Sequence, residues 1–172
     1  MRRVLIVLLI FAVDALLFAA GSPDLLVGIR NGDHSGVQKL LAAGADVNTV
    51  DSDGTTALMH SVIESDVKMM KLLIDHGAKV NAKNTSDSTA LMYAATNLPK
   101  TRLLVDAGAD VNVTNKRGAT PMSVAVTSFG STAVLKLLTS KGARVHDWWR
   151  IEHAGLHTHG NGRRRLSRGC TD

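Results

Sequence analysis

The sequence predicts an all-α solenoid of about four helix–turn–helix repeats linked by β-hairpin-like turns. The first observation is a recurring phrase: Gly-Ala-Asp-Val-Asn at residues 44–48 returns in similar form at 77–81, 108–112 and 142–146, in steps of 33, 31 and 34 residues. A period of this size is typical of stacked repeats. The second is a pair of short helical patterns before each copy. The third is the low aromatic content, six residues in 172. The core must then be built from small aliphatic side chains, which suit close packing of short helices.

The first unit has two helical segments, at residues 24–31 and 35–43, separated by Gly32 and Asp33. It lacks the turn and the threonine that open the later repeats. The terminal unit of a solenoid must present one face to water, so we expect this unit to be an N-terminal cap with a polar outer face.

The second repeat opens with a turn cluster at residues 51–55. Thr56 then stands as an N-cap, whose hydroxyl accepts from a main-chain N–H in the first helical turn. The first helix is predicted at residues 57–63.

A second helix is predicted at residues 67–76, with Ser65 or Asp66 as its cap. Its apolar residues form one broad stripe, as in an amphipathic helix with one buried face. Gly77 follows where the helix ends in a left-handed residue, which glycine adopts without a side-chain clash.

The third repeat has the same layout, with Thr89 before a helix at residues 90–95 and a second helix at 99–106. Asp87 stands where the turn glycine is expected. The connection between the two helices is short, so we expect Asn97-Leu98-Pro99 to be the least regular part of the array.

The fourth repeat begins at Thr120-Pro121, where proline at the first helical position lacks an N–H that would have no partner in any case. Its second helix is predicted at residues 132–140. One extra residue near Phe129-Gly130 accounts for the longer step.

This pattern, Asp-x-x-Gly-x-Thr-x-Leu, then two short helices, then Gly-Ala-x-Val-Asn, resembles the ankyrin repeat. The resemblance covers residues 24–146 and recurs four times in register. In the second repeat the matching residues are Asp51, Gly54, Thr56, Leu58, Gly77, Ala78, Val80 and Asn81.

The resemblance implies a protein partner, bound on a concave face by the turn tips and the first helix of each repeat. The candidate partner-binding residues are Ser52, Asp53, Thr55, His60, Glu64, Ser86, Ser88, Tyr93, Asn97, Lys116 and Arg117. Tyr93 is the best single anchor, because interface hot spots favour Tyr, Trp and Arg. The alternative for Tyr93 is packing between neighbouring first helices.

The N-terminus has the layout of a secretory signal peptide: Arg2 and Arg3, an apolar stretch at residues 4–20 interrupted by Asp14, and small residues before a cleavage point after Gly21. Removal of residues 1–21 would place the protein in the periplasm or outside a bacterium. The alternative is an uncleaved inner-membrane anchor, although 17 residues are short of the roughly 20 that a span needs.

The end of the chain carries a repeat and cap at residues 115–149 and a flexible basic tail at 150–172. Trp148-Trp149 is predicted to cover the last repeat, or else to be an exposed anchor. Histidines at the start of the tail are interpreted as polar surface residues, with metal binding as the alternative. The one cysteine, Cys170, excludes an intramolecular disulfide.

No glycine-rich phosphate loop and no catalytic signature occurs in the sequence. The net charge of +5 is unevenly placed and leaves the repeat region nearly balanced, with no clearly basic face, which argues against nucleic acid as partner. We therefore expect a monomeric, non-catalytic module without cofactor or metal, which binds an exported protein and stabilises or inhibits it. A membrane-tethered scaffold is the alternative. The predicted segments are the signal peptide or anchor at 1–21, the capping repeat at 22–50, a repeat at 51–83, a shortened repeat at 84–114, a repeat and cap at 115–149, and the tail at 150–172.

Overall fold

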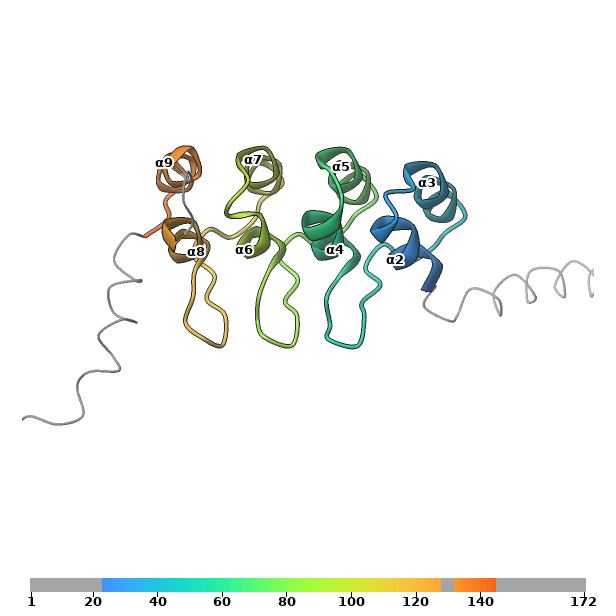
Figure 1. The fold of residues 1–172 in the computed structure, drawn as a ribbon, viewed down its shortest axis with the longest axis horizontal. Helices are drawn as coiled ribbons and strands as arrows, with labels where there is room; N and C mark the ends of the chain where they lie inside the picture. The colour runs from blue at the N-terminus through green and yellow to red at the C-terminus, as the bar shows by residue number, and fades with distance from the viewer. Residues whose placement is uncertain (1–22, 128–131, 145–172) are drawn as a thin grey trace, which may run out of the picture.

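The computed structural model describes residues 23–127 and 132–144 (Figure 1). This part contains helices and turns, with one isolated antiparallel bridge between Val50 and Thr56. Its helices are α2 (Pro23–Arg30), α3 (His34–Ala42), α4 (Ala57–Glu64), α5 (Val67–Asp75), α6 (Ala90–Ala94), α7 (Leu98–Asp106), α8 (Pro121–Thr127) and α9 (Thr132–Ser140).

The helices form four antiparallel pairs stacked in chain order (Figure 1). The first helices of the pairs pack in one row, α2 on α4 on α6 on α8, and α5, α7 and α9 pack in a second row. The connections between pairs project to one side of the stack, beyond the first row (Figure 1). The predicted all-α solenoid of helical pairs is confirmed.

Polar side chains start the helices where the sequence places them. The Thr56 hydroxyl accepts from the Met59 N–H at 3.2 Å and starts α4. Asp66, rather than Ser65, starts α5 and accepts from the Met69 N–H at 2.9 Å. Each bond satisfies an N–H that the helix itself leaves without a partner.

Thr89 departs from this pattern. It occupies the N-cap position of α6, but its hydroxyl oxygen is buried and makes no hydrogen bond. In the fourth pair Thr120 caps as expected, because its hydroxyl accepts from the Ser123 N–H at 3.1 Å. The expectation of a hydroxyl cap is therefore wrong for the third repeat and correct for the second and fourth.

Glycine ends every second helix in a left-handed conformation, with φ between 86° and 94°. The residue after each glycine donates its N–H back to the helix, as Ala78 does to the Leu73 carbonyl at 3.0 Å. This hydrogen bond is the mark of a Schellman motif, which satisfies a carbonyl at the helix end. The predicted role of the recurring glycine is confirmed.

The third repeat is more regular than expected at its inner connection. Asn97 is a normal N-cap, whose side chain accepts from the Lys100 N–H at 3.2 Å. Leu98 and Pro99 are the first two residues of α7, and the Thr101 hydroxyl ties the connection to the Ala94 carbonyl at 2.7 Å. The missing residues shorten α6 to five residues instead of disturbing the connection.

The core runs along the middle of the stack and is built of Leu, Met, Val and Ala side chains. Met59, Met69, Met70 and Leu73 are fully buried in the second pair. Tyr93 is the one aromatic residue in the described part of the chain. The expected aliphatic core is therefore present, and Met suits it because its flexible side chain fills irregular gaps.

Several predictions fall outside the described residues: the signal-like segment 1–21, the extra residue near Phe129-Gly130, the Trp148-Trp149 cap, the histidine and arginine tail, and Cys170. Within residues 23–127 and 132–144, none of the helices is both long and apolar enough to cross a membrane.

Candidate functional site

Three hairpin-like turns, at residues 49–56, 82–89 and 113–120, project from the first row of helices; we call them fingers. One side chain organises the first finger. The Asp51 carboxylate accepts from the Asp53 N–H at 2.9 Å and from the Thr55 N–H at 2.8 Å. The finger is also closed by a main-chain bond from Asp51 N–H to the Thr55 carbonyl.

Asparagine replaces Asp51 in the other two fingers with the same geometry. The Asn84 amide oxygen accepts from the Ser86 and Ser88 N–H groups, both at 3.0 Å. Asn115 accepts in the same way from the main chain two and four residues later. Sequence reasoning did not assign these asparagines a role in the turns; aligning the fingers on Thr56, Thr89 and Thr120 would have shown it.

The fingers are joined to one another at their tips. The Thr85 N–H donates to the Asp53 carbonyl, and the Lys116 N–H donates to the Ser86 carbonyl, both at 3.0 Å. Because these bonds use the main chain, the side chains of the tips are left free to vary. The tips therefore form a continuous row in which the links between fingers do not depend on the side chains at the tips.

The candidate residues at the tips are exposed: Ser52, Asp53, Ser86, Lys116 and Arg117. The first finger offers a carboxylate and the third offers two cations. Neither Lys116 nor Arg117 forms an ion pair within the described residues. The row thus changes from acidic in the first finger to basic in the third, and the middle finger carries one residue of each sign, Lys83 and Asp87.

Tyr93 on α6 lies beside the middle finger and is 38% exposed. Its hydroxyl accepts a hydrogen bond from the Asn84 amide at 2.9 Å, which holds the ring in one orientation. The residue is thus partly packed and partly accessible. Ile63 on α4 is 52% exposed, so an apolar surface accompanies the polar finger tips.

Three candidate residues are buried and cannot offer their side chains to a partner. Thr55 is 8% exposed, His60 6% and Ser88 9%. Thr55 and Ser88 hold equivalent positions at the base of their fingers, where the fold covers them. Their inclusion in a binding surface is wrong, because sequence position alone does not show that a turn residue points back to the helices.

His60 is buried beside the first finger and makes a contact within the fold. Its Nε2 lies 2.9 Å from an Asp51 carboxylate oxygen. Since a carboxylate can only accept, Nε2 carries the proton of this bond. The Arg30 guanidinium from the preceding repeat lies 3.3 Å from the same nitrogen and 3.9 Å from Asp51. The histidine thus joins the first finger to α2 and α4.

The other ring nitrogen of His60 has no hydrogen-bond partner, and Glu64 lies 3.8 Å from it. Partial burial disfavours the charged form of Asp51. Hydrogen bonds from Thr55, His60 and Asp53 outweigh that effect and hold the pKa of Asp51 below its ordinary value of 3.8. In the described residues, no group of three or more His, Cys, Asp or Glu side chains is placed to hold a metal ion.

Glu64 and Asn97, the remaining candidates, are exposed at helix ends. Glu64 is the last residue of α4. Asn97 uses its amide oxygen to cap α7, which leaves its amide nitrogen available. Eight of the eleven candidates are therefore accessible, and one of these also serves the fold.

The repeat architecture agrees with a sequence comparison. The family model for ankyrin repeats, in three copies, matches residues 25–115. The chain belongs to the ankyrin repeat family. No curated protein matches its sequence. Ankyrin repeats are in general protein–protein interaction modules and are typically non-catalytic. The fourth pair, α8 and α9, lies beyond the matched residues and continues the ankyrin stack.

Proposed function

We propose that this ankyrin repeat protein is a non-catalytic module that binds an exported protein and stabilises or inhibits it. The observation that carries the proposal is the row of finger tips, joined by main-chain hydrogen bonds beside the oriented ring of Tyr93. A surface that is rigid before binding loses little conformational freedom on binding.

The charges along the row of finger tips favour a partner with opposite charges at the facing positions. Asp53 and Glu64 are exposed at the second repeat, and Lys116 and Arg117 at the fourth. We infer that the bound segment of the partner carries acidic side chains opposite Lys116 and Arg117. Complementary charge orients a partner and speeds its association.

The proposed compartment rests on residues 1–21, whose basic start, apolar stretch and small-residue end suit export by a bacterium. An exported partner would meet the module in the periplasm or outside the cell.

The test is co-purification from an envelope extract, comparing wild type with Tyr93→Ala and with Lys116→Ala/Arg117→Ala. We expect one reproducible partner that both variants lose. Lys136→Ala on α9 is the matched control, because Lys136 is exposed on a second helix away from the fingers. Equal recovery by all four proteins would refute the finger tips and Tyr93 as the binding surface.

A membrane-tethered scaffold is the second candidate, favoured by the apolar stretch at residues 4–20. N-terminal sequencing of the protein from its native cell separates the two. A chain that starts at Ser22 excludes the tether, and one that starts at Met1 and sediments with membranes supports it.

A further inference from the structure

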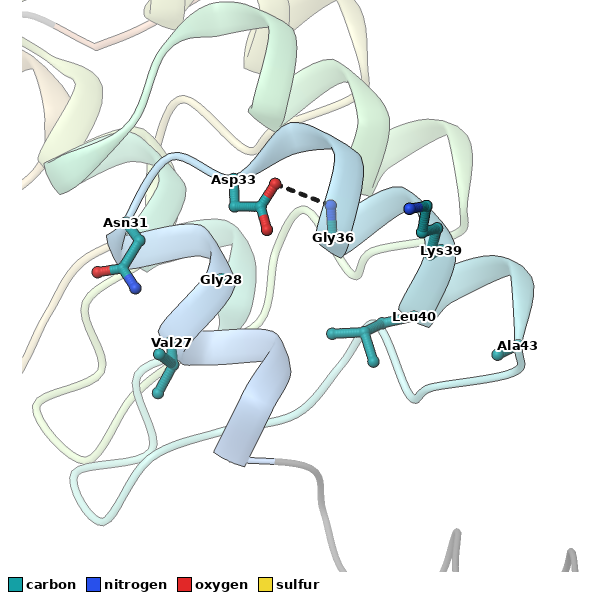
Figure 2. Close-up of a pocket in the computed structure, with 8 residues that line it drawn as sticks. All are labelled: Val27, Gly28, Asn31, Asp33, Gly36, Lys39, Leu40 and Ala43. Carbon is teal, nitrogen blue, oxygen red and sulfur yellow. Dashed lines mark hydrogen bonds between the residues drawn. The ribbon is translucent and has the colours of Figure 1, made fainter.

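The N-terminal end of the stack carries a groove of about 580 Å³ between α2 and α3 (Figure 2). It lies at the opposite end of the first repeat from the face that packs on α4. Its lining includes Val27 and Gly28 from α2, and Asp33, Gly36, Lys39 and Leu40 at and after the start of α3.

This end face combines exposed polar residues, as expected of a cap, with apolar ones. Val27 is 48% exposed, and Leu40 is partly buried at the side of the groove. Gly28 and Gly36 leave parts of its lining without side chains. Every other first helix of the stack has a preceding pair packed against it. Within the described residues nothing covers α2 and α3 in the same way.

The charges beside the groove are self-complementary. Asp33, the N-cap of α3, and Lys39 on α3 both line the groove, six residues or about 9 Å apart along the helix axis. Neither forms an ion pair within the described residues. One carboxylate oxygen of Asp33 accepts from the Gly36 N–H, and the other has no hydrogen bond there. In a twofold arrangement, Asp33 of one copy faces Lys39 of the other.

We propose that a second copy of the chain covers this groove, in a twofold dimer that joins the N-terminal ends of two solenoids. A closed dimer needs one surface that complements itself, and this face has projecting apolar side chains, glycine gaps and opposite charges. The apolar segment 4–20 is the competing occupant. Residues 1–21 carry both signs of charge, Arg2, Arg3 and Asp14, but their removal on export, which belongs to the proposed function and on which this inference rests, would leave the groove open.

The dimer face and the proposed partner surface are separate. Lys39 and Leu40 belong to α3, a second helix, whereas the partner-binding candidates lie on the fingers and at the ends of other helices. A dimer joined at its N-terminal ends would leave both rows of finger tips uncovered. The sequence-based expectation of a monomer did not include this face, because no residue pattern marks it.

The test is the mass of the purified protein in solution by light scattering, at concentrations from about 1 μM to about 1 mM. We expect a concentration-dependent dimer. Leu40→Glu should abolish it, because the groove would have to bury a carboxylate from each copy. Lys39→Glu should raise the dissociation constant about tenfold, since two ion pairs become two repulsions.

Asp33→Asn/Lys39→Glu should recover part of the lost affinity, because asparagine removes the repulsion and still caps α3. Lys136→Glu makes the same charge change on α9 and should leave the dimer intact. Circular dichroism of each variant shows that it is folded.

A wild-type monomer at all concentrations would overturn the proposal. If the protein is a monomer, the melting temperature of Leu40→Glu shows what covers the groove instead. A melting temperature that falls for the full chain, but not for a chain beginning at Ser22, would mean that residues 1–21 cover it. A dimer that persists in both Leu40→Glu and Lys39→Glu would also overturn it. None of these results bears on partner capture through Tyr93.

Discussion

Asn81 explains, on the scale of one side chain, why the recurring phrase ends in asparagine. Its amide oxygen accepts from the Asp110 N–H at 2.8 Å, and its amide nitrogen donates to the Gly108 carbonyl at 2.9 Å. Asn112 makes the equivalent bonds to Arg144 and Gly142 in the next copy. Each asparagine thus joins its own phrase to the following one, and the phrase is the framework that links repeats.

We expect Asn81→Ala to lower the free energy of unfolding by about 1 kcal/mol, because two hydrogen bonds are lost at an exposed position. Urea unfolding followed by circular dichroism measures the change. Ser52→Ala is the control, since Ser52 is exposed and its side chain makes no hydrogen bond within the described residues. Equal stability of the two variants would contradict the linking role.

Asp51 combines two tasks, and its counterparts Asn84 and Asn115 perform only the first. Like them, it orders the main chain of its finger. Unlike them, it carries a charge, which faces His60 and Arg30. The acid in the first finger is therefore explained by its ionic neighbours, because asparagine is sufficient for the turn itself.

Asp51→Asn should keep the finger and lose the ionic contribution, up to about 1 kcal/mol at neutral pH. The folded state holds the pKa of Asp51 below 3.8, so the unfolded chain takes up the proton first. The stabilisation is therefore full above about pH 4 and fades as the pH falls through the lower folded pKa. Urea unfolding of both proteins from neutral pH downward checks this. A stability difference that grows in acid would be the wrong sign.

At the scale of elements, the three fingers share one conformation despite different residues at the bend. Gly54 and Gly118 have φ of 70° and 74°, and Asp87 has φ of 58° at the equivalent place. The left-handed region disfavours residues with a side chain, and Asp is among those that tolerate it best. The middle finger therefore keeps its shape with some strain, although Asp87 stands where the turn glycine is expected.

Asp87→Gly should raise the free energy of unfolding by about 0.5–1 kcal/mol, because glycine adopts this conformation without the side-chain penalty. Asp87→Ala should lower it. The midpoints of urea unfolding are compared for wild type, Asp87→Gly and Asp87→Ala. A midpoint for Asp87→Ala above that of Asp87→Gly would show that strain is absent.

The connection between repeats is reinforced by a lysine that no helical pattern predicts. The Lys100 ammonium at the start of α7 donates to the Val62 and Ser65 carbonyls at 2.6 and 2.8 Å. These carbonyls lie at the end of α4, where a helix leaves its last acceptors without partners. One repeat therefore caps a helix of the repeat before it.

On the scale of the whole molecule, each pair contacts its neighbours, and the fingers are bonded tip to tip. The consequence is one elongated surface whose charge changes from Asp53 to Lys116 and Arg117. The long-range field of such a surface acts on the rate of association more than on the lifetime of a complex.

Lys116→Glu/Arg117→Glu should therefore slow association with the captured partner about tenfold at low salt, with a smaller effect on dissociation. Raising the salt concentration should reduce the difference from wild type, because exposed charges are screened. A flow-based binding assay with the partner fixed to the surface measures the association rate and the dissociation rate. An unchanged association rate at low salt would contradict a role for the charge gradient.

The sequence by itself determined the solenoid, the order of the helices, most helix starts and every helix-ending glycine. These features depend on periodicity and on local main-chain conformations, which short stretches such as residues 44–48 specify alone. The tertiary structure decided which side chains are accessible. His60 is buried beside Asp51, Thr55 and Ser88 are covered, and a groove opens between α2 and α3, because burial depends on what the neighbouring repeat, distant in sequence, places against each residue.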